Sequence, residues 1–390
     1  MTRFSARLPP RTDLNALSRA VESLRTQRVD WIDLTESNPT RVGIRYPSEL
    51  LEALGDPRGL RYEPQPLGLR ETRESIAADC ARRGAVVDPD DVVVCASTSE
   101  AYSWLFKLVC NPGETVLVPQ PSYPLFEHLT RLEGVRAVPY GLRYHGRWEI
   151  DFDALDAAPE GTRAVLIVSP NNPTGSFLSR REFECVAGIC RDRRWALIAD
   201  EVFADYTLDE ESPFTDVACG SDALSFTLAG ASKTLGLPQA KLGWIIVGGP
   251  REERRRAVDA LELIADTFLS VSTPVQLAAR TLLREAAPVR AAIHARVRAN
   301  LNRARRLAAG YPACAVLRVE GGWSAPVRVP ATISEDALVL ALLEHERVLV
   351  HPGYFFDFPH EAFIVISLLP EEQTFEDAMA RTLQRVNDPV

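Results

Sequence analysis

The chain has 390 residues, of which 46% are hydrophobic and 25% are charged, with a formal net charge of −9 at pH 7. This is the composition of an ordinary globular protein that is long enough for two or three domains and a large hydrophobic core. The acidic balance argues against a nucleic-acid-binding protein, and no apolar run approaches the roughly 20 residues that span a membrane.

The cysteines and histidines follow no disulfide or metal-binding pattern. The seven cysteines are scattered and include no C-x-x-C pair, and the six histidines include no H-E-x-x-H motif. An odd number of unclustered cysteines is typical of reduced thiols. The first residues also lack the apolar core of a secretion signal. We therefore expect a cytoplasmic protein without a metal site.

The N-terminal part of the chain predicts helices but no sheet of its own. Residues 13–28 place three leucines and a valine on one helical face. A short strand then leads into a loop turned by Asn38-Pro39, and a further helix is expected over about 69–83.

From Val92 onward, apolar runs alternate with helical patterns. One helix is expected over Thr98–Leu108, and another runs to about Arg193 from the capping box Ser179-x-x-Glu182. Alternating strands and helices predict an α/β protein with a mostly parallel sheet of about seven strands, sandwiched by helices. The seven runs are Val92–Val94, Val116–Val118, Ala137–Val138, Val165–Val168, Ala196–Ile198, Phe226–Leu228 and Ile245–Val247.

The C-terminal part predicts a second, smaller α+β domain. After Pro250 the pattern is mainly helical to Gly310, and one long helix carries an apolar stripe every four residues from Val289 to Leu301. Its arginines are expected on solvated faces. The last 80 residues return to short strands and two helices. We predict a large domain over 43–289 and a small domain made of 1–42 and 290–390.

The loop Ala229–Leu242 contains two of the three lysines in the chain, Lys233 and Lys241. The other 41 of the 44 basic residues are arginines. Arginine stays charged and is no nucleophile, whereas a lysine amine can lose its proton and attack a carbonyl. Two ordinary surface lysines are the alternative interpretation, but their pairing between two apolar runs favours amine chemistry.

An amide, a carboxylate and an amine are expected at one edge of the sheet. Asn171 and Asn172 follow one apolar run, Asp200 follows the next, and Lys233 follows the one after. Ligands of open parallel sheets bind beyond the carboxyl ends of the strands. Pyridoxal phosphate needs this set: a lysine for the Schiff base, a carboxylate for the protonated pyridine nitrogen and an amide for the phenolic oxygen.

A phosphate site is expected at Ala96–Ser99, which follows the run Val92–Val94 and opens a helix. A helix N-terminus offers free N–H groups and the positive end of a dipole to an anion. The same Ser/Thr run is also an ordinary N-cap. Similarly, Tyr123 in PQPSYP is open to two interpretations, a ligand-stacking ring or an aromatic turn residue.

Four segments together, VPQPSYP, SPNNPTG, DEVF and SK(x)7K-LGW, resemble the class I/II aminotransferases of the type I pyridoxal-phosphate fold. The resemblance covers nearly the whole chain in the right order. It implies that Lys233 carries the cofactor, that Asp200 pairs with its ring nitrogen and that Asn172 bonds its phenolic oxygen. It also implies that Tyr123 stacks on the ring.

The resemblance extends to the phosphate and to the assembly. Ser97 and Thr98 match the phosphate-binding turn. Tyr62 resembles the tyrosine that reaches the phosphate of the neighbouring subunit, although its spacing to Gly68 is one residue longer than usual. The implied assembly is a homodimer with shared active sites.

Several positions depart from the family pattern. Phe203 stands where many members have a tyrosine and Gly230 where a phosphate-binding serine is usual. Lys241 replaces an arginine, which keeps the charge but loses the bidentate fork. Val365 stands where an arginine usually clamps the α-carboxylate of the substrate.

Arg41 and Arg45, in a loop that usually lines the substrate pocket, are the nearest candidates to replace the missing arginine. With 41 arginines in the chain, most are simply solvated.

The expected activity is that of an aminotransferase, which moves an amino group between an amino acid or amine and a 2-oxo acid, with Lys233 as general base. The departures keep a second interpretation open, a β- or γ-eliminating lyase or a cyclase of specialised metabolism. A third is a ligand sensor or an inactive homologue. Residues 1–30 are short for the DNA-binding segment of such sensors, and an inactive homologue is expected to lose Lys233.

Overall fold

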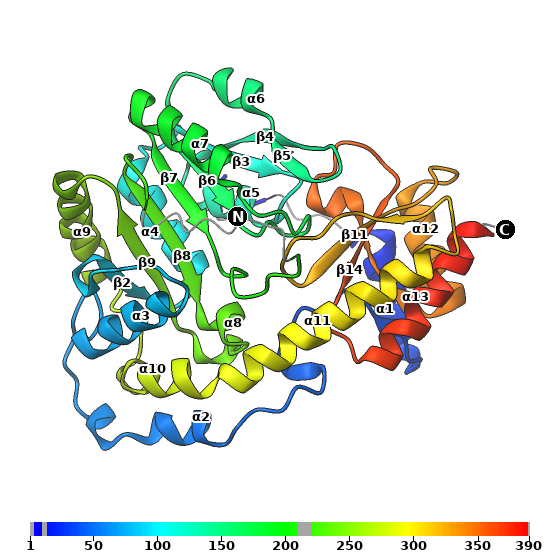
Figure 1. Ribbon diagram of the computed structural model, residues 1–390, viewed down its shortest axis with the longest axis horizontal. Helices are drawn as coiled ribbons and strands as arrows, with labels where there is room; N and C mark the ends of the chain where they lie inside the picture. The colour runs from blue at the N-terminus through cyan, green and yellow to red at the C-terminus, as the bar shows by residue number, and fades with distance from the viewer. Residues whose placement is uncertain (1–3, 10–13, 210–219, 389–390) are drawn as a thin grey trace.

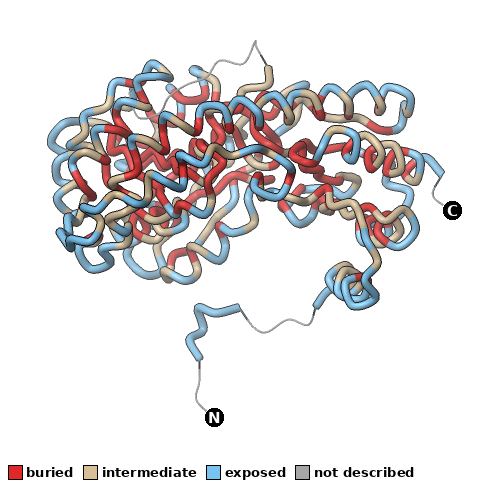
Figure 2. The backbone as a smooth tube through the Cα atoms, turned by 90° about the horizontal axis from the view of Figure 1, so that it is seen from below, coloured by how far each residue is buried: buried red, intermediate tan, exposed pale blue. Residues whose placement is uncertain are grey.

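The computed structural model describes residues 4–9, 14–209 and 220–388. Within them the chain forms a large lobe around an eight-stranded sheet and a small lobe around a four-stranded sheet (Figure 1). The long helix α11 (Ala287–Ala308) runs from one lobe to the other. Buried residues extend through the middle of both lobes (Figure 2).

The large sheet confirms the predicted fold class and adds one strand to it. Its parallel centre is joined by two antiparallel strands, β9 beside β8 and β5 at the edge beside β4. The strands follow in the spatial order β2 (Val92–Cys95), β9 (Gly243–Gly248), β8 (Ser225–Gly230), β7 (Ala196–Asp200), β6 (Thr162–Val168), β3 (Thr115–Gln120), β4 (Arg136–Tyr144) and β5 (Trp148–Ile150).

The prediction of seven strands was therefore one short, because β5 was missed. This strand has three residues, only the first of which is buried, and it pairs with β4 alone. Three residues are too few for an alternation of apolar and polar residues to indicate a strand, and only the pairing with β4 identifies it.

Helices cover both faces of the large sheet because successive side chains of a strand point to opposite faces. In β2, Val93 packs in a core with α4 and α9, whereas Val92 and Val94 pack in another core with α3 and α10. Farther along the sheet, Val165 and Ile167 pack against α6 and α7. The helices are α3 (Arg70–Arg82), α4 (Thr98–Val109), α5 (Phe126–Leu132), α6 (Phe152–Asp156), α7 (Arg180–Arg193), α9 (Arg251–Asp266) and α10 (Thr273–Glu285).

Two short helices, α2 (Glu49–Glu52) and α8 (Ala231–Thr234), complete the large lobe. The capping box that predicted α7 is present in both directions: Ser179 accepts from the backbone of Glu182, and Glu182 accepts from the backbone of Ser179. None of the helices in the described part of the chain combines the length and apolar character that a bilayer-spanning helix needs.

The small lobe contains a sheet in the order β10 (Ala315–Val316), β11 (Ser324–Arg328), β14 (Phe363–Ser367) and β13 (His351–Pro352). It is completed by α12 (Glu335–Ala341), α13 (Glu372–Asn387) and α1 (Ala16–Gln27). Strand β1 (Ile32–Asp33) pairs with β12 (Val348–Leu349), so this early segment lies with the C-terminal part. The apolar stripe predicted on α11 is buried along its length. Residue 289 lies inside this continuous helix, and the domain boundary there stays a prediction.

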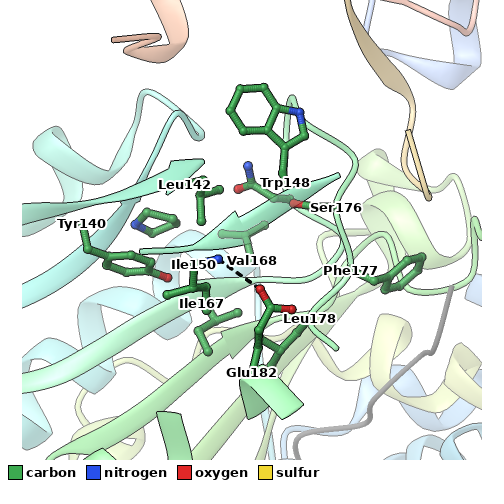
Figure 3. Close-up of a pocket in the computed structure, with 12 residues that line it drawn as sticks. Tyr140, Leu142, Trp148, Ile150, Ile167, Val168, Ser176, Phe177, Leu178 and Glu182 are labelled. Carbon is green, nitrogen blue, oxygen red and sulfur yellow. Dashed lines mark hydrogen bonds between the residues drawn. The ribbon is translucent and has the colours of Figure 1, made fainter. Parts of the chain in front are cut away.

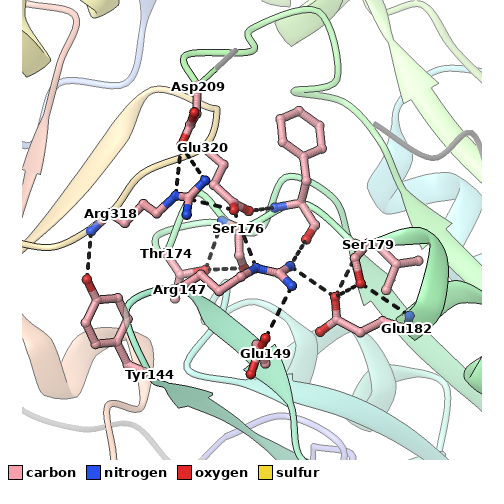
Figure 4. Close-up of polar contacts among 12 residues, drawn as sticks. Tyr144, Arg147, Glu149, Thr174, Ser176, Ser179, Glu182, Asp209, Arg318 and Glu320 are labelled. Carbon is pink, nitrogen blue, oxygen red and sulfur yellow. Dashed lines mark hydrogen bonds and ion pairs between the residues drawn. The ribbon is translucent and has the colours of Figure 1, made fainter. Parts of the chain in front are cut away.

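A network of polar side chains ties the hairpin β4–β5 to the small lobe (Figure 4). Arg147 donates to Glu182 at 3.0 Å and lies 3.5 Å from a carboxylate oxygen of Glu320. Glu320 in turn accepts from the backbone N–H of Phe177 at 2.8 Å. Nearby, Gly175 has φ +69°, and a Cβ there would lie 2.5 Å from Val319. The network therefore fixes the loop after β6 against the small lobe.

Beside this network lies a small pocket of about 20 Å³, lined by Tyr140, Trp148, Ile167 and their neighbours (Figure 3). The backbone N–H of Ile150 donates to Glu182 at its edge. A space of this size holds about one water molecule. A larger ligand must therefore bind elsewhere.

Candidate active site

The loops that follow strands β2, β3, β6, β7 and β8 surround a cavity of about 610 Å³, which the small lobe closes on its other side. Its size lies in the range of small-molecule and cofactor sites, roughly 300–1,000 Å³. The lining includes Ser97, Thr98, Tyr123, Asn172, Asp200, Phe203, Lys233 and Lys241. Eight residues that the sequence singled out thus meet at one cavity.

Lys233 enters the cavity from α8, the single helical turn after β8. Its Nζ lies 3.5 Å from the carbonyl oxygen of Ser37, 4.8 Å from the centre of the Trp323 ring and 5.6 Å from that of Phe203. Burial among these groups lowers the pKa of Lys233 to about 8, although the carboxylate of Asp200 opposes the shift. The amine is therefore closer to its reactive, uncharged form than an exposed lysine is.

Asp200 is the last residue of β7 and is buried. The hydroxyl of Tyr102 donates to Oδ2 at 2.7 Å, and the backbone N–H of Val202 donates to Oδ1 at 3.1 Å. Burial nevertheless raises the pKa of Asp200 to about 6. Among the described residues no cation hydrogen-bonds this carboxylate; Lys233 only attracts it through space. The site thus offers a buried carboxylate to a cationic donor.

The N-terminus of α4 lines one part of the cavity. Ser97 caps the helix by accepting from Glu100 N–H, and Glu100 accepts from Ala96 N–H. In the described part of the chain, the backbone N–H groups of Thr98 and Ser99 have no partner. The ammonium group of Lys241, which also lines this cavity, has none there either. Free N–H groups at a helix N-terminus and a nearby cation suit a phosphate.

Gly230, where the family usually has a serine, is crowded. It pairs with Gly243 across β8 and β9, and a Cβ on Gly230 would lie 3.1 Å from the carbonyl oxygen of Leu242. Packing therefore leaves little room for a side chain at this position, and the N-terminus of α4 and Lys241 remain as donors to this part of the cavity.

The structure separates the two asparagines of the SPNNPTG loop. Asn171 is buried and engaged, since it accepts from Ser122 at 2.7 Å and donates to Pro121 at 3.0 Å and to Thr174 at 2.8 Å. The side chain of Asn172 faces the cavity and has no partner among the described residues. Asn172 is therefore the amide that is free to bind a ligand.

Two aromatic residues of the predicted site also line the cavity. Tyr123 is 40% exposed, and its ring meets Phe126 edge-on at 6.0 Å. Phe203 packs edge-on against Trp323 at 5.3 Å. Its buried ring forms an apolar wall beside Lys233, where many family members have a hydroxyl group.

Three predicted residues do not line this cavity. Arg41 and Arg45 are exposed and lie outside its lining. Tyr62 is 75% exposed and lies in a separate shallow pocket with Gly68 and Ser270. A role for these residues in their own subunit's cavity therefore has no support from the described contacts.

Sequence reasoning missed the small-lobe wall and one partner of Asp200. Trp323, Ser324 and His351 line the cavity but follow no motif. Tyr102 had a weak signal, because it lies one turn beyond Thr98 on a predicted helix, where its side chain follows the same face toward the sheet.

Comparisons with known proteins agree with this geometry. The sequence profile of the family described as aminotransferase class I and II matches residues 29–381. The chain is 26% identical over 366 residues to the glutamate-pyruvate aminotransferase AlaA of Haemophilus influenzae, covering 92% of this chain and 91% of that one. It is 25% identical over 364 residues to an alanine aminotransferase of Mycobacterium tuberculosis, covering 90% and 84%.

Solved structures give the same result. The fold matches a crystal structure of an aminotransferase from Escherichia coli with a TM-score of 0.88 and 25% identity, over 99% of this chain and 98% of that one. It also matches the alanine aminotransferase of Pyrococcus furiosus in fold, with a TM-score of 0.87 and 23% identity over 95% and 96% of the two chains. The chain therefore belongs to the class I and II aminotransferase family, whose members depend on pyridoxal phosphate.

Proposed function

We propose that the protein transfers an amino group between an amino donor and a 2-oxo acid, with its cofactor held by Lys233. The observation that carries this proposal is the pairing of a half-buried amine of lowered pKa with a buried carboxylate beside a helix N-terminus suited to a phosphate. The AlaA protein of Haemophilus influenzae and the alanine aminotransferase of Mycobacterium tuberculosis, both named as aminotransferases, add support.

The residues present fit pyridoxal phosphate. Lys233 would bind its aldehyde carbon and Asp200 its protonated ring nitrogen, which would satisfy the carboxylate that now has no cationic donor. Asn172 would donate to the phenolic oxygen, and Tyr123 would cover the ring. Ser97, Thr98 and Lys241 would hold the phosphate. When bound, this group supplies a ring that withdraws electrons from the substrate carbon.

Lys233 serves two purposes in this proposal. Its amine holds the cofactor before the substrate arrives, and once displaced it takes the proton from the substrate carbon and returns it during transfer. The apolar faces of Trp323 and Phe203 keep the amine poorly hydrated, which holds its pKa near the working range of a base. Asp200 remains ionised because a cation lies against it.

A half-reaction tests the proposal. The cofactor-loaded protein is mixed with one amino donor at a time, and the visible absorption band is followed while the products are identified by mass spectrometry. We expect loss of the band, a stoichiometric oxo product and retention of the donor nitrogen on the protein. Release of ammonia with an unsaturated or eliminated product would instead indicate a lyase.

The assembly is proposed to be a homodimer with shared sites. Exposed Tyr62 lies away from its own cavity, as expected for a residue that reaches a neighbour. In mixed dimers of Lys233→Ala and Tyr62→Ala chains, one of the two sites would contain both wild-type residues. Recovery of activity on mixing, with a dimer in sedimentation, supports sharing; no recovery contradicts it.

The compartment is proposed to be the cytoplasm. Six cysteines lie in the described residues and none of them forms a disulfide bond, while Cys219 lies outside these residues. Unpaired thiols suit a reducing compartment. Fractionation of the native host would test this placement.

A further inference from the structure

The cavity contains no arginine among its described lining residues, although the chain has 41. Its lysines are Lys233 and Lys241, and both lie on the large-lobe side. The small-lobe side is formed by Trp323, Ser324, His351, Phe355, Phe356, Val365 and Ser367. No residue in this group carries a fixed positive charge. A carboxylate placed against this small-lobe wall would therefore lose its hydration without gaining a cationic partner, so an oxo acid that binds as acceptor must direct its carboxylate away from this wall.

Val365 closes the wall where an arginine would have projected. Its side chain is 1% exposed and packs in the core with Phe356 and Phe358. The residue opposite it across the strand pair β13–β14 is His351. The imidazole of His351 is therefore the neighbouring side chain that the sheet places beside Val365.

His351 is held in place by aromatic packing. Its ring stacks on Phe355 at 4.9 Å with an interplanar angle of 1° and meets Phe356 edge-on at 5.5 Å. Within the described residues neither ring nitrogen is hydrogen-bonded. Burial lowers the pKa of His351 to about 4, although the carboxylate of Asp33 opposes the shift. At neutral pH the ring is therefore uncharged, with one donor and one acceptor.

A second uncharged polar group, Ser324, lies on the same wall of the cavity. Ser324 faces the cavity, and its hydroxyl has no partner in the described part of the chain. It lies opposite Ser367, whose own hydroxyl is already engaged with the carbonyl of Glu36. The small-lobe wall thus combines uncharged donors and acceptors with aromatic faces.

We infer that His351 binds the substrate at the position of the missing arginine, and that the preferred amino donor presents an uncharged group there instead of a carboxylate. Such donors are amines with an aromatic or apolar body and a neutral group, such as an amide, on the amine-bearing carbon. This inference rests on the proposed function, because it assigns the donor class of that site.

Binding of two matched, unreactive probes tests the inference without turnover. We expect 3-phenylpropanamide to bind the cofactor-loaded protein at least about tenfold more tightly than 3-phenylpropanoate, by calorimetry at neutral pH, because the acid would be buried without a cation. Equal or tighter binding of the acid would overturn the inference. That result would also follow if a second copy of the chain supplied an arginine.

Variants of His351 assign the effect to this residue. His351→Phe keeps the stacked ring but removes both hydrogen-bonding atoms, and it should weaken amide binding about tenfold. With phenylalanine amide as donor it should raise KM and leave kcat nearly unchanged. His351→Gln keeps a neutral donor and acceptor and should recover most of the affinity. His351→Arg should shift the preference toward the acid.

A control variant tests for general disturbance of this segment. Tyr354→Phe removes a hydroxyl that donates to Asp336 outside the cavity, and it should leave both probe affinities unchanged. An unchanged amide affinity in His351→Phe would overturn the assignment of the residue.

Reactive donors separate the inference from the proposed function. If phenylalanine gives its oxo acid faster than phenylalanine amide reacts, the inference fails and the aminotransferase proposal stands. If no amine or amino acid gives an oxo product, the proposed function itself fails.

Discussion

The two sides of the cavity differ in charge. The large-lobe side carries Lys233, Lys241, Asp200 and the N-terminus of α4, whereas the small-lobe side presents aromatic rings, two serines and an uncharged histidine. The first set comes from strand ends and a helix terminus, where backbone geometry directs groups to one edge. The second comes from a separate sheet. The comparison indicates that the fold itself fixes where the charged groups lie, whereas the side chains of the small lobe set the character of the opposite wall.

The strongest test of the charged side is Lys233→Ala. Without the amine, the visible band of the lysine-bound cofactor should disappear, and turnover should fall by at least about a thousandfold. Lys107→Ala is the matched control, because Lys107 pairs with Glu133 on the outer face of α4. A borohydride-trapped adduct on the Lys233→Ala protein, mapped to Lys241 or Lys107, would contradict the assignment.

Asp200→Asn should lower turnover about a hundredfold, because a neutral amide no longer keeps the ring nitrogen protonated. The cofactor should still bind. The variant therefore distinguishes a carboxylate that acts through its negative charge from one that only packs in the structure. Turnover within a few-fold of the parent would remove Asp200 from the reaction.

Asp200→Asn should also change the free energy of unfolding. Burial raises the pKa of Asp200 to about 6 in the folded protein, so the stability from this group is present below pH 4 and is lost as pH rises through 6. Asparagine does not ionise, so Asp200→Asn does not lose stability in this way as the pH rises. The cofactor-free variant should therefore be more stable than the parent at pH 7 by roughly 1–3 kcal/mol. Denaturant unfolding at pH 4 and 7 checks it; an equal difference at both values would contradict this cause.

Lys241→Ala should weaken cofactor binding by about ten- to a hundredfold, because one charge-assisted contact to the phosphate is lost. Lys241→Arg should bind the cofactor at least as tightly as the parent, since arginine keeps the positive charge and can donate two parallel hydrogen bonds to the phosphate. Equilibrium dialysis of the cofactor measures both. If the alanine variant binds normally, the free N–H groups of α4 alone hold the phosphate.

The charged side should also show a pH dependence, whose change per pH unit is smaller than the effects of the substitutions. Burial lowers the pKa of Lys233 to about 8, and only the unprotonated amine attacks the cofactor. The rate of attachment to cofactor-free protein should therefore rise about tenfold per pH unit below pH 8 and level off above it. Growth of the visible band after mixing measures this rate. A rate that keeps rising to pH 10 would show that the amine is not desolvated.

The sequence by itself determined the charged side. Lys233, Asp200, Asn172 and the Ser97 turn each lie at or shortly beyond the carboxyl end of a strand that its apolar run reveals, so local pattern and chain order suffice to place them at one edge. The same local signals predicted the parallel sheet, the capping box of α7 and the stripe of α11.

Only the tertiary structure decided the uncharged side and the finer assignments. His351 and Val365 meet through an antiparallel pairing within the small sheet, and Trp323, the residue before β11, approaches Lys233 from the small lobe. Which asparagine is engaged also depends on partners outside its own loop, Pro121 and Ser122. These contacts join residues far apart in the chain, and no local periodicity encodes which of them face one another.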